Sequence, residues 1–367
     1  MLHLSVLPHS FSLRPPELCH TEGPAFTMAF LKEFLRQLIH LDTPDEAVTT
    51  YQGTVTPYSP FSASHDAAIL DKAIKAKGVD EATIMDLLVK RSNSQRQEIK
   101  AAYQQACGRE ALDAALASAL RGDLEDLALA LLRTPAQYDA QRMKKAMQGL
   151  GTNEDVLVEI LTSRTNKEIR ELKTAYKEEY QAELEDDIKA ETSGDFRTAL
   201  LSLCKASRSE DYTVNKPLAD SDAQALYEAG EKKRGTDCTV FIDILTTRSA
   251  PQLRRTFKRY TKYSKLDVSA ALDSELRGDI EDCLTTIVKC AGSKSAFFAE
   301  KLHSAMKGLG TRTDTLIRVL VSRSEVDLKM VKEKYKRQYG HSLQQDIRAD
   351  VSGDLEAVLV ALCGGDN

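Results

Sequence analysis

Tryptophan is absent from this chain of 367 residues, and aromatic residues make up only 6% of it. Proline is scarce between residues 66 and 362, where it stands only at Pro135, Pro217 and Pro251. Because proline interrupts helix interiors, its scarcity leaves long stretches open to helix. No apolar run approaches the roughly 20 residues that a membrane-spanning helix needs, and the alternating pattern of strands is missing. These absences predict an all-α protein whose contact with any membrane is peripheral.

The chain also has no strong charge of either sign. Lysine and arginine number 50 against 55 aspartate and glutamate residues, the formal net charge is -5, and the charges are interspersed. Such a balance provides no general attraction to nucleic acid or to an anionic bilayer. We therefore predict no specific nucleic-acid binding. An anionic partner would need a local basic patch or a bridging cation.

The seven cysteines are scattered, odd in number and without a CxxC motif, which is typical of reduced thiols in a cytoplasmic protein. Residues 1–10 lack a basic segment and a small-residue cleavage site, so a signal peptide is not expected. Neither HExxH nor GxSxG occurs. The stretch Gly230–Thr236 resembles a phosphate-binding loop but lacks the lysine that must follow its second glycine. We predict that the chain is not an enzyme.

The first 64 residues differ from the rest of the chain. Residues 1–27 contain four prolines and no sustained period, which predicts a disordered extension. Residues 28–64 are predicted to hold a regulatory amphipathic helix at Ala29–Leu41 and then a linker. Phe30, Phe34 and Leu38 are spaced to form an apolar stripe on that helix. The stripe suits docking on the protein's own body and binding of a partner equally well.

Residues from about Asp66 to Leu362 form a fourfold repeat. Four glycines mark its register, and each is followed after 13 residues by arginine and after 25 by tyrosine. The glycines are Gly78, Gly151, Gly235 and Gly310; the arginines are Arg91, Arg164, Arg248 and Arg323; the tyrosines are Tyr103, Tyr176, Tyr260 and Tyr335. Coincidences in fixed register predict stacked copies of one unit. The predicted boundaries are residues 65–136, 137–208, 209–295 and 296–367.

Inside each unit the pattern is helical. Apolar residues recur at i, i+3 and i+4, as at Ile84, Leu87 and Leu88, which buries one face of a helix. A unit of about seventy residues leaves room for four or five short helices. The surplus between the second and third register glycines falls in Lys205–Asp222, where we predict the longest connector between repeats. The repeated arginine is expected to be structural and to pair between helices of one repeat.

A glycine-rich loop recurs together with an acidic residue forty residues after its last glycine. The pairs are Met147–Thr152 with Glu191, Met306–Thr311 with Asp350, and the altered Gly230–Thr236 with Glu275. Glycine tolerates positive φ and lets the backbone close around an ion. Calcium accepts six to eight oxygens in flexible geometry, so converging carbonyls and one carboxylate suit it better than magnesium or zinc. We predict that the chain binds several calcium ions.

These motifs, held in register from about Asp66 to Leu362, resemble those of the annexin family. Thr165–Arg170, Phe297–His303 and the segment that begins at Ala29 are most similar to its lipocortin-type members. The resemblance implies an all-α fold of four annexin repeats with about five short helices each. The repeats would form a curved disc, preceded by the amphipathic N-terminal helix.

The resemblance also implies which atoms bind calcium. In each of the last three repeats, backbone carbonyls of the loop would meet the carboxylate of the distant acid, and open coordination positions would take water or a lipid phosphate. The loop residues are Met147, Gly149, Gly151 and Thr152 with Glu191 in the second repeat, Gly230, Lys233 and Gly235 with Glu275 in the third, and Met306, Gly308 and Gly310 with Asp350 in the fourth.

The first repeat departs from this formula, since Ala119 stands where the acid should be. A full calcium site is not expected there. Smaller sites resembling those of the family would use Gly78 and Val79 with Glu81, Ala117 and Leu120 with Glu125, and, in the third repeat, Asp273 and Leu276 with Glu281. A solvated acidic helix start, which favours the helix dipole, explains each minor group equally well.

The functions that the resemblance implies are calcium-dependent binding to anionic phospholipid membranes, membrane aggregation and vesicle traffic, inhibition of phospholipase A2 by sequestering its substrate, and an anti-inflammatory role. It implies a cytoplasmic protein, peripheral at the plasma membrane and endosomes, with the nucleus, or secretion without a signal peptide, as further locations. Residues 29–41 would bind an S100-type dimer. Relatives carry a phosphorylatable tyrosine where this chain has Ala47, which leaves kinase regulation there open. The alternative is a calcium-insensitive helical scaffold for protein contacts.

Overall fold

The computed structural model of the chain describes residues 52–106, 111–149, 151–233, 235–308 and 310–364. Within these ranges every regular element is a helix, as the sequence predicts. The predictions for residues 1–51, including the amphipathic helix at Ala29–Leu41, lie outside the described residues.

Five helices make up the described part of the first repeat, and side-chain caps explain where some of them begin. Ser62 accepts a hydrogen bond from the backbone N–H of His65, and Asp80 accepts one from that of Thr83. Such caps satisfy N–H groups that a helix start leaves unpaired. The helices are α2 (Ala63–Ile74), α3 (Glu81–Val89), α4 (Asn93–Ala106), α5 (Leu112–Ala119) and α6 (Gly122–Leu132).

The second repeat has the same order of helices with stronger start signals. Thr134 and Gln137 form a capping box, as do Thr165 and Glu168, so each pair satisfies two N–H groups reciprocally. Pro135 occupies the first position of its helix, where the missing N–H costs nothing. The helices are α7 (Pro135–Ala146), α8 (Glu154–Ser163), α9 (Asn166–Tyr180), α10 (Leu184–Glu191) and α11 (Gly194–Cys204).

The third and fourth repeats share one long helix. Helix α16 (Asp279–Met306) is kinked at Ser293, whose φ of -156° and ψ of 107° are not helical. Its first part closes the third repeat and its second part opens the fourth. The third repeat begins with α12 (Lys216–Ala229), α13 (Cys238–Thr247), α14 (Ala250–Tyr260) and α15 (Val268–Glu275), and the fourth ends with α17 (Thr313–Arg323), α18 (Leu328–Tyr339), α19 (Leu343–Asp350) and α20 (Gly353–Leu362).

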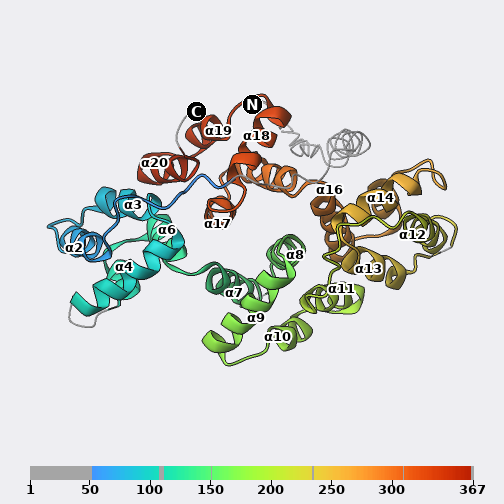
Figure 1. Cartoon of the computed structure of the whole chain (residues 1–367), viewed down its shortest axis with the longest axis horizontal. Helices are drawn as coiled ribbons and strands as arrows, with labels where there is room; N and C mark the ends of the chain where they lie inside the picture. The colour runs from blue at the N-terminus through green and yellow to red at the C-terminus, as the bar shows by residue number, and fades with distance from the viewer. Residues whose placement is uncertain (1–51, 107–110, 150, 234, 309, 365–367) are drawn as a thin grey trace, which may run out of the picture.

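The four repeats form a flattened body. Viewed down the shortest axis, the first repeat lies at one end of the long axis and the third at the other, with the second and fourth between them (Figure 1). The buried apolar residues fall into two cores, one shared by the first and fourth repeats and one shared by the second and third. Repeats far apart in the sequence are therefore packed together, and two modules result.

A buried ion pair confirms the structural role predicted for the repeated arginine. Arg164, after α8, makes two hydrogen bonds of 2.7 and 2.8 Å with Asp139 of α7. Arg91 with Asp66 and Arg248 with Asp222 repeat the arrangement in the first and third repeats. The fourth repeat differs because Phe298 takes the place of the aspartate. There the Arg323 guanidinium lies 4.7 Å from the centroid of the Phe298 ring.

The longest described connector between repeats lies between α11 and α12, as predicted, but it is shorter than predicted. It covers residues 205–215 rather than 205–222, because Lys216 already begins α12. Pro217, which we assigned to the connector, lies in the first turn of this helix. Proline is tolerated there because first-turn N–H groups have no helical acceptor.

The segment before the first helix runs along the fourth repeat. The backbone N–H and side-chain hydroxyl of Thr54 both donate to the carbonyl of Ser324, and the hydroxyl also donates to that of Leu362 at 2.6 Å. These bonds tie the segment to two places in the fourth repeat, the residue after α17 and the end of α20. Among the helices of the described ranges, none is long and apolar enough to cross a membrane.

Candidate calcium centres

The loop between the first and second helix is closed in the same way in all four repeats. The residue two positions after the register glycine donates its backbone N–H to a buried alanine carbonyl near the end of the preceding helix, at 2.8–3.0 Å. The pairs are Asp80 with Ala73, Asn153 with Ala146, Asp237 with Ala229, and Arg312 with Ala305. The third loop contains one residue more than the others. The inserted residue changes the sequence motif of this loop, but the backbone hydrogen bond that closes the loop is kept.

The threonine that follows the register glycine joins the loop to the distant acid. The Thr311 hydroxyl donates to the Asp350 carboxylate at 2.6 Å and reaches the Asp350 carbonyl at 3.2 Å. Thr236 contacts the carboxylate and carbonyl of Glu275 at 3.1 and 3.4 Å. Thr152 reaches the Glu191 carbonyl at 3.4 Å. The structure therefore brings each predicted loop to its predicted acid across about forty residues.

Each of these acids is the last residue of the fourth helix of its repeat. Glu191 ends α10, Glu275 ends α15 and Asp350 ends α19. The carbonyls of a helix C-terminus carry partial negative charge and lack helical partners. A cation held near such a terminus gains from this charge as well as from the carboxylate. The shared position makes the three sites equivalent in construction.

The loop glycines adopt a backbone that other residues rarely tolerate. Gly149 and Gly151 have φ of 98° and 94°, and Gly308 and Gly310 repeat this at 111° and 89°. No heavy atom lies within 4 Å of the position that a Cβ would take, so conformation and not space requires glycine there. A positive φ at every second residue lets successive carbonyls turn to one side. This is the arrangement that a carbonyl-ligated ion needs.

In the third repeat a close contact also requires glycine. A Cβ on Gly230 would lie 3.2 Å from Cζ of Phe241, the buried ring of α13. The backbone N–H of Lys233 donates to the Gly230 carbonyl at 2.9 Å, which folds the inserted residue into a turn. The Lys233 ammonium lies 3.3 Å from the Asp237 carboxylate. Gly230, Lys233 and Gly235 are thus held in one loop, as the prediction for this altered motif requires.

Tyrosines of the third helix contact either the loop or the helix that carries the distant acid, a role that the sequence analysis did not identify. The buried Tyr260 donates its hydroxyl to Glu231 at 2.5 Å, next to Gly230. Tyr335 donates to Asp346 of α19 at 2.5 Å, and Tyr176 donates to Asp187 of α10. Burial and these carboxylates raise the pKa of each tyrosine, so the hydroxyls stay protonated and donate. The constant spacing of 25 residues between the loop glycine and this tyrosine was the feature of the sequence that could have indicated the role.

The first repeat lacks the contact that the other three share. Val79 replaces the loop threonine and adopts a positive φ of 42°, and Ala119 ends α5 where the others carry an acid. Neither side chain offers an oxygen. The Asp80 carboxylate beside the loop already accepts from the backbone and hydroxyl of Thr83. The first repeat therefore lacks the threonine–acid contact, and the absence of a full calcium site there stays a prediction.

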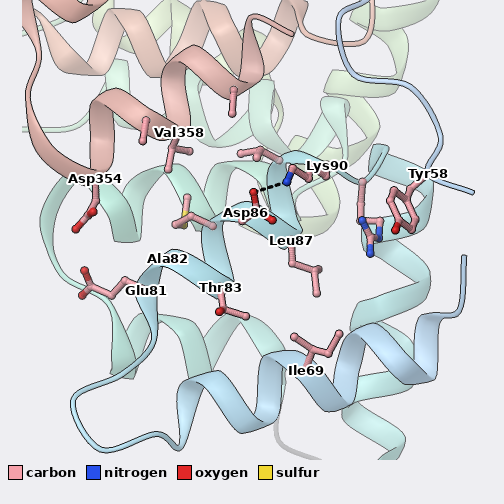
Figure 2. Close-up of a pocket in the computed structure, with 15 residues that line it drawn as sticks. Tyr58, Ile69, Glu81, Ala82, Thr83, Asp86, Leu87, Lys90, Asp354 and Val358 are labelled. Atoms are coloured by element: carbon pink, nitrogen blue, oxygen red, sulfur yellow. Dashed lines mark ion pairs between the residues drawn. The ribbon is translucent and has the colours of Figure 1, made fainter. Parts of the chain in front are cut away.

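The residues of the three predicted minor sites lie in different surroundings. Glu81, the first residue of α3, lines an open cavity of about 710 Å³ between α2, α3 and α20. Figure 2 shows Glu81 beside Asp354 at one side of this cavity, with Leu87 and Ile69 supplying an apolar wall. The cavity is therefore distinct in character from the glycine-rich loops.

In the third repeat the minor-site acids do come together. Burial, a hydrogen bond with Asp273 and the charge of Asp273 raise the pKa of Glu281 to about 7. The negative charge of Asp273 favours the protonated form of Glu281, so calcium binding through both carboxylates would release that proton. In the first repeat Ala117 stands at the position of Asp273, and Glu125 in the first turn of α6 is the remaining acid.

The chemistry of the donors fits calcium. Among the residues that the structure describes, no group of three or more His, Cys, Asp or Glu side chains could hold a metal ion. The loops instead offer backbone carbonyls and one carboxylate each. Zinc and other softer ions favour imidazole and thiolate, whereas calcium accepts carbonyl and carboxylate oxygens in irregular numbers. The groups gathered at each loop are accordingly oxygen donors, which is the set that a hard cation prefers.

Four stacked helical repeats with such loops define a class, and comparison with known proteins identifies it. The sequence model of the annexin family matches residues 65–131, 138–203, 221–287 and 297–362, one match for each repeat. The chain belongs to the annexin family. Annexins are membrane-binding proteins, generally without enzymatic activity, that bind phospholipids in a calcium-dependent manner.

Individual relatives place the chain within this family. It is 58% identical to annexin A1 of Homo sapiens over 347 residues, which covers 92% of this chain and all of that protein. Its fold is similar to that of annexin III, with a TM-score of 0.85 and 47% identity over 86% of this chain and 98% of that one. A calcium-bound annexin (Sm)1 is 33% identical, with a TM-score of 0.76 and coverage of 90% and 97%. The chain is thus an annexin similar to annexin A1.

Proposed function

We propose that the loops of the second, third and fourth repeats each hold a calcium ion and that the chain binds anionic membranes through them. The residues that would hold the ions are the loop carbonyls with Glu191, Glu275 and Asp350. The observation that carries this proposal is the threonine contact, which joins loop and acid in these three repeats. In the first repeat both partners are replaced at once, by Val79 and Ala119.

Bound calcium would supply positive charge and coordination positions that the chain leaves open to water or to a lipid phosphate. The chain supplies at each loop three carbonyls and one carboxylate, fewer than the six to eight oxygens of a filled shell. Each loop alone should therefore bind weakly, on the order of 10⁻⁵ to 10⁻³ M. Because lipid completes the shell, calcium binding and membrane binding must strengthen each other equally.

The charge of the chain sets the calcium dependence. The formal net charge of -5 opposes approach to an anionic bilayer until calcium is bound. Several loops that engage one surface increase the effective concentration of the later contacts, which makes the dependence on calcium steep. The same contact would cover phospholipid and so deny it to phospholipase A2. Inhibition by substrate sequestration, membrane aggregation, vesicle traffic and an anti-inflammatory role follow as parts of this proposal.

Binding of residues 29–41 to an S100-type dimer belongs to the same proposal, as does a cytoplasmic location peripheral to the plasma membrane and endosomes. These points are supported by the similarity to annexin A1. A pull-down of the chain by an immobilised S100-type dimer, with and without residues 1–51, tests the first. Loss of capture on truncation supports it, and unchanged capture contradicts it.

Cosedimentation with phosphatidylserine vesicles tests the main proposal. The parent chain should pellet with vesicles in calcium and remain in the supernatant in chelator. Replacement of Glu191, Glu275 and Asp350 by alanine should raise the calcium needed for half-maximal pelleting by at least about tenfold, since each site loses its carboxylate. Binding by the triple variant at the parent's calcium concentration would contradict the proposal. A parent that stays in the supernatant in both conditions would favour the calcium-insensitive scaffold.

A further inference from the structure

Two arginines occupy the carbonyls that the minor calcium sites would use. In the first repeat, Nη1 of Arg121 donates to the carbonyls of Ala117, Ser118 and Leu120 at 3.2, 3.0 and 2.6 Å. In the third repeat, Nη1 of Arg277 donates to the carbonyls of Asp273 and Leu276. These carbonyls lie at the C-terminal ends of α5 and α15.

The arrangement around Arg121 resembles coordination of a cation more than ordinary hydrogen bonding. One guanidinium nitrogen carries two protons, yet three carbonyl oxygens lie within 3.2 Å of it. A spherical ion can serve all three oxygens equally, whereas two protons do so only by sharing one proton between two oxygens in a three-centre hydrogen bond. Calcium needs distances of about 2.3–2.6 Å, so the farthest of the three oxygens, at 3.2 Å, would have to close by at least about 0.6 Å.

The repeats differ from one another at this position. Arg121 and Arg277 directly precede the glycine that follows the fourth helix, Gly122 in one repeat and Gly278 in the other. The second and fourth repeats carry Ser193 and Ser352 in the same place. The arginines are therefore confined to the two repeats at opposite ends of the long axis (Figure 1).

We propose that Arg121 and Arg277 act as tethered cations that occupy the minor sites and must be displaced before calcium enters them. This proposal rests on the proposed function, because it assumes that the chain binds calcium. Both arginine side chains belong to exposed residues, so displacement leaves the guanidinium in water at little cost. Calcium should consequently fill the three main loops first, and the minor sites only at higher concentration.

The two sites should differ in strength. Around Arg277 the carboxylates of Asp273 and Glu281 accompany the carbonyls, and around Arg121 only that of Glu125 is present. Affinity for calcium rises with the number of charged ligands. Removal of Arg277 should therefore expose the stronger of the two sites.

Calcium titration of the full chain by calorimetry, without lipid, tests the proposal with R277S and R121S. Serine is the residue that the other two repeats use, and it is a good residue before a helix start, so both variants should fold. R277S should bind about one calcium ion more per molecule than the parent over the same concentration range, and R121S should show a smaller gain. R277Q provides the same test should serine destabilise the chain, which melting in chelator would reveal.

The control is R133S. Arg133 also lies just after a helix, α6, but its guanidinium is bound to the carboxylate of Glu179 at 2.9 Å and not to carbonyls. R133S should therefore leave the calcium isotherm unchanged. If the gain in calcium binding came only from the removal of a positive charge, R133S would show it as well. Such a gain would also decrease in 0.5 M KCl, because salt screens distant charges. A gain confined to R277S that persists in salt supports displacement.

Superimposable isotherms of the parent, R121S and R277S would overturn this inference while leaving the three main loops in place. A parent chain that binds no calcium would instead overturn the proposed function. The parent titration distinguishes the two failures, because the first calcium ions bind in the first case and do not bind in the second.

Discussion

At the scale of the residue, the loop threonine joins the glycine-rich loop to the distant acid through its hydroxyl. We expect T311V to weaken the fourth site, because valine cannot donate to Asp350 and the first repeat, which carries Val79 at this position, has no such contact. A hydrogen bond to a charged group contributes about 1.5–3 kcal/mol. The calcium needed for half-maximal binding at this site should rise by roughly tenfold or more. Calorimetric titration of single-site variants, in which only the fourth loop keeps its acid, measures this directly.

The matched control for that prediction is T174V. Thr174 lies exposed on α9, and its hydroxyl donates to the Arg170 carbonyl within the same helix at 3.1 Å. Its replacement should leave calcium binding unchanged. Equal affinities of T311V and T174V would show that the threonine contact does not position Asp350.

Part of the candidate site could be predicted from the sequence because its residues recur at a fixed spacing. The pairing of the loops with Glu191, Glu275 and Asp350, and the lack of such a pairing in the first repeat, followed from that register. The contacts of Arg121 and Arg277 did not, because an exposed arginine can reach many acceptors. Only the folded backbone shows which carbonyls lie within its reach.

At the scale of the element, the fourth repeat replaces an ion pair between helices with a stacked ring. Arg323 lies over Phe298 and takes its carboxylate from Asp327, whose Oδ1 is 2.7 Å from Nε. In the second repeat the corresponding Arg164 depends on Asp139 of α7. Both repeats keep the arginine, but the carboxylate that neutralises its charge comes from a different part of the repeat.

This difference predicts unequal costs of losing the carboxylate. D139N should lower the free energy of unfolding by about 3–5 kcal/mol, because it leaves a charged arginine buried and unpaired. D327N should cost about 1.5–3 kcal/mol, since Asp327 is 15% exposed and Arg323 keeps its ring. Urea denaturation of the calcium-free chain measures both. Equal losses would mean that the Phe298 ring does not support Arg323.

The helices themselves were largely predictable, since each unit repeats one apolar spacing and several starts carry capping residues. The junction of the third and fourth repeats was not. Helix α16 runs through the boundary and bends at Ser293 without a proline to mark the bend. The end of the connector before α12 was also missed, because Pro217 suits both a loop and a first turn. Local sequence does not decide between two conformations that both tolerate the same residue.

At the scale of the whole molecule, the two apolar cores are joined by charged residues. Glu159 of α8 belongs to the second repeat, and Arg318 of α17 belongs to the fourth. Their side chains are 0% and 1% exposed and form hydrogen bonds of 3.0 and 2.8 Å. Lys301 lies 3.3 Å from the same carboxylate. A buried, mutually satisfied cluster of this kind fixes how the two modules sit against each other, because any shift would leave a charge unpaired.

The same cluster predicts how stability depends on pH. Burial alone would raise the pKa of Glu159, but the charges of Arg318 and Lys301 outweigh burial and lower the pKa from 4.5 to about 2. Because the folded pKa lies below the unfolded one, the carboxylate stabilises the fold above about pH 4.5, and this contribution is lost as the pH falls toward 2. E159Q should lower the free energy of unfolding at pH 7 by about 3–5 kcal/mol, and its stability should then decline less than the parent's between pH 4.5 and 2.5.

The control is E178Q, at an exposed position of α9, whose free energy of unfolding should depend on pH in the same way as the parent's. If the free energy of unfolding of E159Q, measured in chelator, declined with falling pH in parallel with that of the parent, then Glu159 would not hold the two modules together through its charge.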